Sequence, residues 1–161
     1  MKKVQCEGSD QDRLPVEELI RKALEARKNS YTPYSHFQVG AALLTESGQI
    51  YTGCNIENAA YGPTVCAERC AIFKAVSEGE RSLKAIAIAG GSENETDILS
   101  GYAFPCGVCR QVMREFAKDA SFKVIVARST AEYQIFSLEE LLPNSFGPGN
   151  LSDEGLEGGK E

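Results

Sequence analysis

Three cysteines in two short motifs constrain this chain more than any other feature. Cys66 begins the motif Cys-Ala-Glu, and Cys106 and Cys109 follow about forty residues later in Pro-Cys-Gly-Val-Cys. If their thiolates share one zinc ion, the fold must bring two distant segments to one point. Structural zinc sites close all four coordination positions with protein, whereas catalytic sites keep one position for water. A three-cysteine site therefore predicts a hydrolytic zinc enzyme, in which Glu68 is free to carry protons.

Length and composition are typical of one globular domain. The 161 residues are 42% hydrophobic and 25% charged, with a net charge of −6, close to the average soluble protein. No apolar run approaches the roughly 18–20 residues that span a bilayer, and the N-terminus lacks the apolar segment of a secretory signal. We therefore expect a cytoplasmic protein without a membrane partner, whose six cysteines are metal ligands or buried thiols rather than disulfides.

The acidic charge also limits the class of partner. Proteins that bind a phosphate backbone draw most of their affinity from clusters of lysine and arginine, and no such block occurs in this sequence. A polymeric nucleic acid is therefore disfavoured as a partner, and a small uncharged substrate fits the composition better.

Hydrophobic patterning predicts alternating helices and strands. Helical spacing or helix-start signals indicate helices over 16–24, 66–78 and 106–118, and a Ser-x-x-Glu capping box at 137–140 opens a short fourth helix. Apolar runs bounded by turn residues indicate strands over 39–44, 49–53, 85–89, 123–127 and 133–136. The connection at 46–48 is short enough to make the first two strands an antiparallel hairpin.

The order of these elements predicts the fold class. Strand, helix, strand, helix, strand in the middle of the chain requires parallel crossovers, whereas the link at 128–132 is too short for one. We therefore expect an α/β fold of three layers, α/β/α, around a five-stranded mixed sheet whose last two strands are antiparallel. We expect a single domain at 13–148, with a flexible N-terminal tail at 1–12 and a flexible, acidic, Gly-rich tail at 149–161.

Each candidate ligand stands at the start or in the first turn of a predicted helix, where backbone N–H groups and the helix dipole favour thiolate. Two adjacent parallel strands would deliver both helix starts to one edge of the sheet, where open α/β sheets bind ligands. Three thiolates around a zinc dication leave a net charge near −1, so donors to sulfur are expected nearby. Arg69, Arg110 and Gln111 are the candidates, because they closely follow ligands.

Two alternatives stay open on this evidence. Glu68 could simply favour the start of its helix as a first-turn acid. Cys70, four residues after Cys66, could act as the fourth ligand of a closed structural site. Against the second alternative, Cys70 belongs to a small apolar helix face on which a buried thiol is the commoner outcome.

Taken together, the motifs resemble those of the zinc-dependent nucleobase and nucleoside deaminases, in which a glutamate beside the ligands moves protons. Cysteine as the first ligand, in place of histidine, is similar to the free-nucleoside cytidine deaminases with small subunits. The similarity covers about residues 14–150 and includes Ser-His-Phe-Gln-Val-Gly-Ala-Ala at 35–42, Gly-Cys-Asn-Ile-Glu-Asn at 53–58 and Leu-Leu-Pro-Asn-Ser-Phe-Gly-Pro at 141–148. It implies one zinc ion per chain and hydrolytic deamination of cytidine and 2′-deoxycytidine to uridine and 2′-deoxyuridine, a step of pyrimidine salvage.

The resemblance also implies roles for individual residues. Phe37 would stack near the pyrimidine, and Asn55 and Glu57 would hydrogen-bond the ribose hydroxyls. The backbone N–H of Ala67 and the carboxyl of Glu68 would bind the pyrimidine carbonyl and ring nitrogen. The simpler interpretations are a core aromatic for Phe37 and solvated loop residues for Asn55 and Glu57.

The same resemblance implies a homotetramer whose sites are completed by neighbouring subunits. Ala59, Tyr61 and Phe146 match the positions that reach into an adjacent pocket, although Phe146 could instead dock its own tail. Three other functions remain to be separated by experiment: deamination of other cytosine nucleosides such as nucleoside antibiotics, a non-enzymatic zinc-ribbon-like interaction module, and RNA or DNA editing.

Overall fold

The structure is a computed structural model that describes residues 14–151 except 97, 118 and 120. The expected N-terminal tail and all but the first residues of the expected C-terminal tail lie outside the described residues. The helices are α1 (Val16–Arg27), α2 (Ala67–Ser77), α3 (Gly107–Phe116) and α4 (Leu138–Leu141), followed by a 3₁₀ turn at Pro148–Asn150. The strands are β1 (Phe37–Thr45), β2 (Ile50–Cys54), β3 (Leu83–Ser92), β4 (Lys123–Ala127) and β5 (Tyr133–Ser137). Every expected element is present, and the predicted capping box at Ser137 forms.

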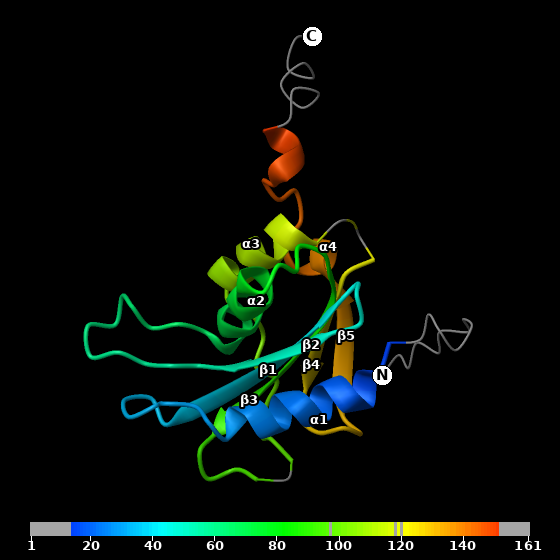
Figure 1. Cartoon of the computed structure of the whole chain (residues 1–161). Helices are drawn as coiled ribbons and strands as arrows, with labels where there is room; N and C mark the ends of the chain where they lie inside the picture. The colour runs from blue at the N-terminus through cyan, green and yellow to red at the C-terminus, as the bar shows by residue number, and fades with distance from the viewer. Residues whose placement is uncertain (1–13, 97, 118, 120, 152–161) are drawn as a thin grey trace.

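The five strands form one mixed sheet in the order β2-β1-β3-β4-β5, as Figure 1 shows. β1 is antiparallel to both β2 and β3, β3 and β4 are parallel, and β4 and β5 are antiparallel. The sheet that the sequence predicted is therefore confirmed, including the antiparallel last pair.

One detail of the predicted topology was wrong. The strands that precede the two ligand helices, β2 and β3, are not adjacent, because the short hairpin seats β2 on one side of β1 and β3 takes the other. They still run in the same direction, since both are antiparallel to β1. Gly40 of β1 faces Cys54 of β2 on one side and Ala89 of β3 on the other. Both strands therefore end at the same edge of the sheet. The two ligand helices can still begin at this edge, as expected, although the strands before them are not neighbours.

Helices cover both faces of the sheet, which confirms the three layers (Figure 1). Alternation along β1 assigns Ala41 and Leu43 to the core under α2 and α3, and Ala42 and Leu44 to the core over α1. All four side chains are buried, because successive residues of a strand point to opposite faces. A continuous apolar run is what a strand covered on both sides requires.

The close contact between α2 and β2 depends on a glycine. A Cβ at Gly53 would lie 2.5 Å from the backbone oxygen of Ala67 and 2.5 Å from the backbone nitrogen of Ala71. Any side chain at this position would push the first turns of α2 away from the sheet. Gly53 therefore fixes where the helix that follows Cys66 begins.

A buried arginine at the end of α1 binds backbone oxygens at the start of β1 and at the end of β3. Arg27 is only 4% exposed, and its guanidinium donates to the backbone oxygens of Gln38 (3.2 Å), Glu95 (2.8 Å) and Ser92. Burial lowers the pKa of Arg27, and the carboxylate of Glu95 partly opposes that shift. This cation therefore ties the start of β1 to the end of β3, next to the loops that surround the candidate site.

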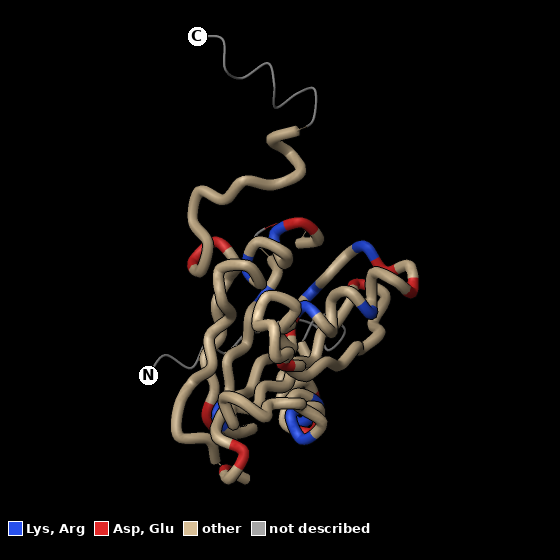
Figure 2. Tube along the Cα trace, turned by 90° about the vertical axis from the view of Figure 1, so that its left-hand side faces the viewer, with Lys and Arg blue, Asp and Glu red and all other residues tan. Residues whose placement is uncertain are grey.

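Charged positions are interspersed along the described part of the chain, with no continuous basic stripe in the view of Figure 2. None of the helices in this part is both long and apolar enough to cross a bilayer.

Candidate active site

A cavity of about 240 Å³ opens at the edge where β2 and β3 end, near the lower end of the roughly 300–1,000 Å³ typical of ligand pockets. Its walls come from the start of β1, the loop after β2, the first turn of α2, the middle of β3 and the loop before α3. The lining residues are Phe37, Val39, Asn55, Glu57, Thr64, Val65, Cys66, Ala67, Glu68, Ile88, Ala103, Phe104 and Cys106. Half of the site residues that the sequence indicated therefore line one cavity.

The three predicted ligands lie together beside this cavity, and two of them, Cys66 and Cys106, line it. Their Sγ atoms all lie within 4.8 Å of one another, and those of Cys66 and Cys106 are 3.9 Å apart. Tetrahedral zinc with Zn–S bonds of about 2.3 Å requires sulfurs about 3.8 Å apart. The Cys66–Cys106 pair has this spacing, and the third sulfur lies close enough to share the same ion. Cys66 and Cys106 are the N-cap residues of α2 and α3, and Cys109 lies in the first turn of α3.

Arg69 supplies positive charge to these sulfurs. One of its terminal nitrogens lies 3.6 Å from the Sγ of Cys66, in a direction that allows donation. The pKa of Cys66 is lowered, because the Cys109 thiol donates to its sulfur and Arg69 adds a second donor. The Cys109 thiol, which keeps its proton in that arrangement, has a raised pKa. In the described part of the chain, Nε of Arg69 is the one buried side-chain nitrogen or oxygen without a hydrogen-bond partner. A buried guanidinium with an unpaired N–H fits a site in which several thiolates bring negative charge close to it.

Cys70 is not part of the sulfur cluster. Among the residues that the structure describes, the group that could hold a metal consists of Cys66, Cys106 and Cys109. Burial raises the pKa of the Cys70 thiol, which disfavours the thiolate that zinc binds. The geometry therefore gives three ligands, and the four-cysteine alternative gains no support from it.

Glu68 lies in the first turn of α2 and is buried to 96%, with 4% of its surface exposed. It lines the cavity next to Cys66 and Cys106. Burial raises the pKa of Glu68 to about 7, and the nearby Cys66 thiolate contributes to the shift. A metal cation among the sulfurs would draw the pKa down again. A buried acid that titrates near neutrality beside a metal site is suited to accepting and returning protons.

Asn55 and Glu57 face the cavity and also hold its neighbouring wall. The Asn55 side chain accepts from the backbone N–H of Val39 (2.8 Å) and donates to the backbone oxygen of Phe37 (2.9 Å). The Glu57 carboxylate accepts from the backbone N–H of Tyr34 at 2.9 Å. These bonds fix the entrance to β1, where the Phe37 ring is 43% exposed. Asn55 keeps one amide N–H for a ligand, and the Glu57 carboxylate keeps lone pairs that could accept from one.

Ala59, Tyr61 and Phe146 lie outside this cavity. All three are exposed, Tyr61 to 73% and Phe146 to 58%. Phe146 belongs to the segment after α4, which Figure 1 shows extending away from the body of the domain. The hydrogen bond from the amide nitrogen of Gln111 goes to the backbone oxygen of Phe146, at 2.9 Å, and not to a ligand sulfur. Gln111 therefore steadies the segment that carries Phe146.

Arg110, the other candidate donor to sulfur, bonds to backbone instead. Its guanidinium donates to the oxygen of Pro105 at 2.8 Å and to that of Leu141 at 2.7 Å. Because Pro105 precedes Cys106, these bonds fix the turn that presents two ligands and tie it to α4.

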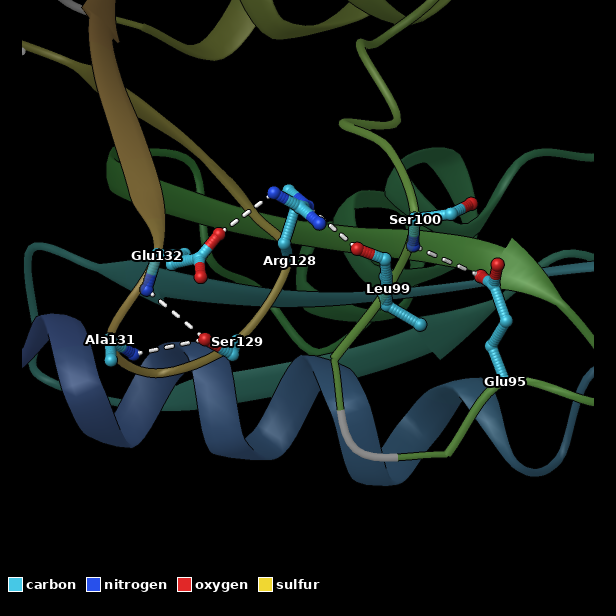
Figure 3. A network of polar contacts seen from close by, with 7 residues as sticks. All are labelled: Glu95, Leu99, Ser100, Arg128, Ser129, Ala131 and Glu132. Atoms are coloured by element: carbon cyan, nitrogen blue, oxygen red, sulfur yellow. Dashed lines mark hydrogen bonds and ion pairs between the residues drawn. The ribbon is translucent and has the colours of Figure 1, made fainter.

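Sequence reasoning missed the wall formed by Ala103 and Phe104. The available signal was an aromatic residue directly before Pro-Cys, in a position adjoining a ligand. The loop that carries this wall is held further back by Arg128, whose Nε donates to the backbone oxygen of Leu99 at 2.6 Å (Figure 3). The backbone N–H of Leu99 donates in turn to the oxygen of Arg128, and the Arg128 guanidinium also pairs with Glu132 at 2.8 Å.

Comparison with known proteins agrees with this geometry. Residues 15–126 match the profile of the family described as "Cytidine and deoxycytidylate deaminase zinc-binding region". The chain is 47% identical over 139 residues to a cytidine deaminase of Sporosarcina psychrophila, covering 86% of this chain and 96% of that one. It is 45% identical over 135 residues to a cytidine deaminase of Halalkalibacterium halodurans, covering 84% and 96%. The crystal structure of cytidine deaminase from Burkholderia pseudomallei superimposes with a TM-score of 0.71 at 42% identity, over 80% of this chain and 97% of that one.

Proposed function

This chain belongs to the cytidine and deoxycytidylate deaminase family, and from that premise we propose that it hydrolyses cytidine and 2′-deoxycytidine to uridine and 2′-deoxyuridine. The observation that carries the proposal is the meeting of three thiols, spaced for one zinc ion, with a buried glutamate on the same cavity wall. When bound, zinc supplies the Lewis acidity that lowers the pKa of water enough for attack near neutral pH. The role in the cell that fits this reaction is pyrimidine salvage in the cytoplasm.

Glu68 moves the protons of the reaction. Its carboxylate accepts a proton from the attacking water and gives it to N3 of the pyrimidine, while the water oxygen bonds to C4. It then transfers the second water proton to the amino group on C4. The C4–N bond breaks, ammonia leaves, and the proton on N3 remains in the product uracil ring, so that one water is consumed for each ammonia released.

The remaining wall residues bind and orient the nucleoside. Phe37 stacks on the pyrimidine, and the remaining N–H of Asn55 and the carboxylate of Glu57 bond the ribose hydroxyls. The Ala67 backbone N–H, at the start of α2, binds the carbonyl at C2. Arg69 offsets the net negative charge that three thiolates impose, which keeps the metal able to acidify water.

We also propose that the active form is a homotetramer in which neighbouring subunits complete each site. The support is the exposure of Tyr61 and Phe146, two large aromatics outside their own chain's cavity, with Ala59 on the same loop as Tyr61. Sedimentation equilibrium measures the subunit number. In a mixing test, Phe146→Ala supplies an intact Glu68 and Glu68→Gln supplies an intact Phe146. If Phe146 completes a neighbouring site, mixed tetramers regain activity that neither variant has alone; no recovery on subunit exchange rejects this role.

The function is tested by following the ultraviolet spectrum of cytidine with purified protein, beside zinc quantification. We expect conversion to uridine with one zinc per chain. A protein that holds one zinc per chain and leaves cytidine and 2′-deoxycytidine unchanged would instead be a zinc-dependent interaction module. Arabinosyl and other modified cytosine nucleosides, assayed in parallel, measure the sugar preference, and an oligonucleotide binding assay at low salt tests editing.

A further inference from the structure

Phe104 is an exposed aromatic residue with no part in the roles assigned above. Its side chain is 46% exposed, and it lines the cavity beside Cys106. The back of its ring is supported, since its centroid lies 5.5 Å from that of Phe136 on β5 in an edge-on arrangement. Phe136 itself packs against the core under α2 and α3. The Phe104 ring is therefore braced from behind and has apolar area free to be covered by a ligand.

The chemistry of the site decides which edge of a bound pyrimidine faces Phe104. C4 must lie at the sulfur cluster, and its two ring neighbours are N3 and C5. Glu68 delivers a proton to N3, so the N3 edge lies against the first turn of α2. C5 lies on the other side of C4, away from Glu68, and the cavity-lining residues that adjoin the ligand Cys106 in the loop before α3 are Ala103 and Phe104.

Ala103 and Phe37 lie close together next to Gly90 of β3. A Cβ at Gly90 of β3 would lie 2.7 Å from the Cβ of Ala103 and 3.2 Å from Cε1 of Phe37. Ala103 and the Phe37 ring thus approach the same point of β3 closely, which leaves little space there for a substituent that projects toward Ala103. Because the loop is tied to β4 through Arg128 and Leu99, the wall does not give way easily.

We propose that Phe104 is a specificity-determining residue that closes the cavity against substituents on C5 of the pyrimidine, so that 5-methylated cytosine nucleosides are poor substrates. This inference rests on the proposed function, since the orientation of the base follows from deamination at C4. Phe104 acts by direct contact with the base, and Phe136 holds its ring in place. A methyl group that a pocket cannot accept changes kcat/KM by about 10- to 200-fold.

The test compares kcat/KM for cytidine and 5-methylcytidine in wild type, Phe104→Ala and Phe104→Leu. For each protein we take the ratio of kcat/KM for 5-methylcytidine to kcat/KM for cytidine. Comparing this ratio between variants cancels the intrinsic effect of the methyl group on reactivity, because that effect is the same in all of them. We expect the relative activity on 5-methylcytidine to rise at least tenfold in Phe104→Ala and by a smaller factor in Phe104→Leu. Phe73→Leu is the matched control, because Phe73 is equally exposed (49%) but lies on α2 outside the cavity lining, and it should leave the ratio unchanged.

A binding measurement keeps the inference separate from the proposed function. Calorimetry with zinc-loaded protein gives dissociation constants for uridine and 5-methyluridine. In Phe104→Ala the ratio of the 5-methyluridine constant to the uridine constant should fall about tenfold, as expected for the relative activity. If wild type fails to turn over cytidine, the proposed function is wrong, and the binding ratio still reports on the wall. A ratio that changes less than threefold in both Phe104 variants, with zinc content and circular dichroism intact, overturns the inference.

Discussion

Glu68→Gln is the sharpest perturbation that the site offers. The amide has nearly the same size and shape as the carboxyl, and the position is 4% exposed, so packing is preserved while the proton acceptor is lost. The neutral amide also removes the cost of a buried carboxylate, so the unfolding free energy should stay the same or increase. What changes is proton transfer alone.

The expected loss follows from the number of steps in which Glu68 takes part. A positioned general acid or base contributes about 10²- to 10⁴-fold to the rate. Because Glu68 serves both the attack on C4 and the departure of ammonia, we expect kcat to fall at least about 10³-fold. At about 1.4 kcal/mol per tenfold change, this is a barrier about 4 kcal/mol higher.

The assay is the absorbance change of cytidine under saturating substrate, with zinc measured on the same samples. Glu115→Gln is the control, since Glu115 is an exposed acid on α3, the other ligand helix. Glu68→Gln should retain zinc and should melt at or above the wild-type temperature. If it retains a tenth or more of the wild-type rate with zinc bound, Glu68 is not the proton carrier; if zinc is lost, its role is in holding the metal.

Three further outcomes are expected. Arg27→Met removes a charged donor from three backbone oxygens, each worth about 1–3 kcal/mol when left unpaired and partly recovered by water; we expect about 3 kcal/mol of destabilisation in urea titrations, against little for the exposed Arg21→Met, and equal midpoints for the two would refute this. Chelation of zinc should lower the melting temperature by about 5–10 °C, because a ligand present at 100 times its dissociation constant contributes about 2.7 kcal/mol; an unchanged melting temperature after verified loss of zinc would show that the metal does not hold the two helix starts together. The pKa of Glu57 is lowered, chiefly by a hydrogen bond from the Ser35 side chain, with backbone N–H groups adding to it, so its stabilising effect is present above the unfolded pKa of about 4.3 and is lost as the pH falls through the folded pKa. The melting-temperature difference between wild type and Glu57→Gln should accordingly be present at pH 7 and shrink below about pH 4, and a difference that stays constant with pH would contradict this assignment.

Local patterns in the sequence were sufficient for the elements and for the metal ligands. The apolar run of β1, the small-residue strand β3 and the helix starts at Cys66 and Cys106 can be recognised from residues close together in the chain, because periodicity and capping act over a few positions. The spacing of Cys106 and Cys109 also places two thiols on one face of a first turn without reference to the rest of the fold.

The interactions that complete the site depend on segments that are far apart in the sequence. Nothing near Arg27 indicates that its guanidinium binds carbonyls from residues 38, 92 and 95, and Asn55 and Glu57 could not be seen to support the backbone around Phe37. Gln111 was expected near sulfur and instead bonds the backbone of Phe146. Hydrogen-bond partners of long polar side chains are decided by whichever groups the packed chain leaves unpaired.

The sequence by itself therefore predicted a set of zinc ligands, a glutamate that we propose carries protons, and the layers of an α/β fold, since each is encoded in short-range spacing. Only the tertiary structure decided that β1 separates the two strands leading to the ligand helices, and that Phe104 faces the cavity braced by Phe136. Strand order and the direction of a loop side chain depend on which surfaces meet when the whole chain packs. Segments far apart in the sequence compete for those surfaces, so the outcome cannot be read from the residues around any one position.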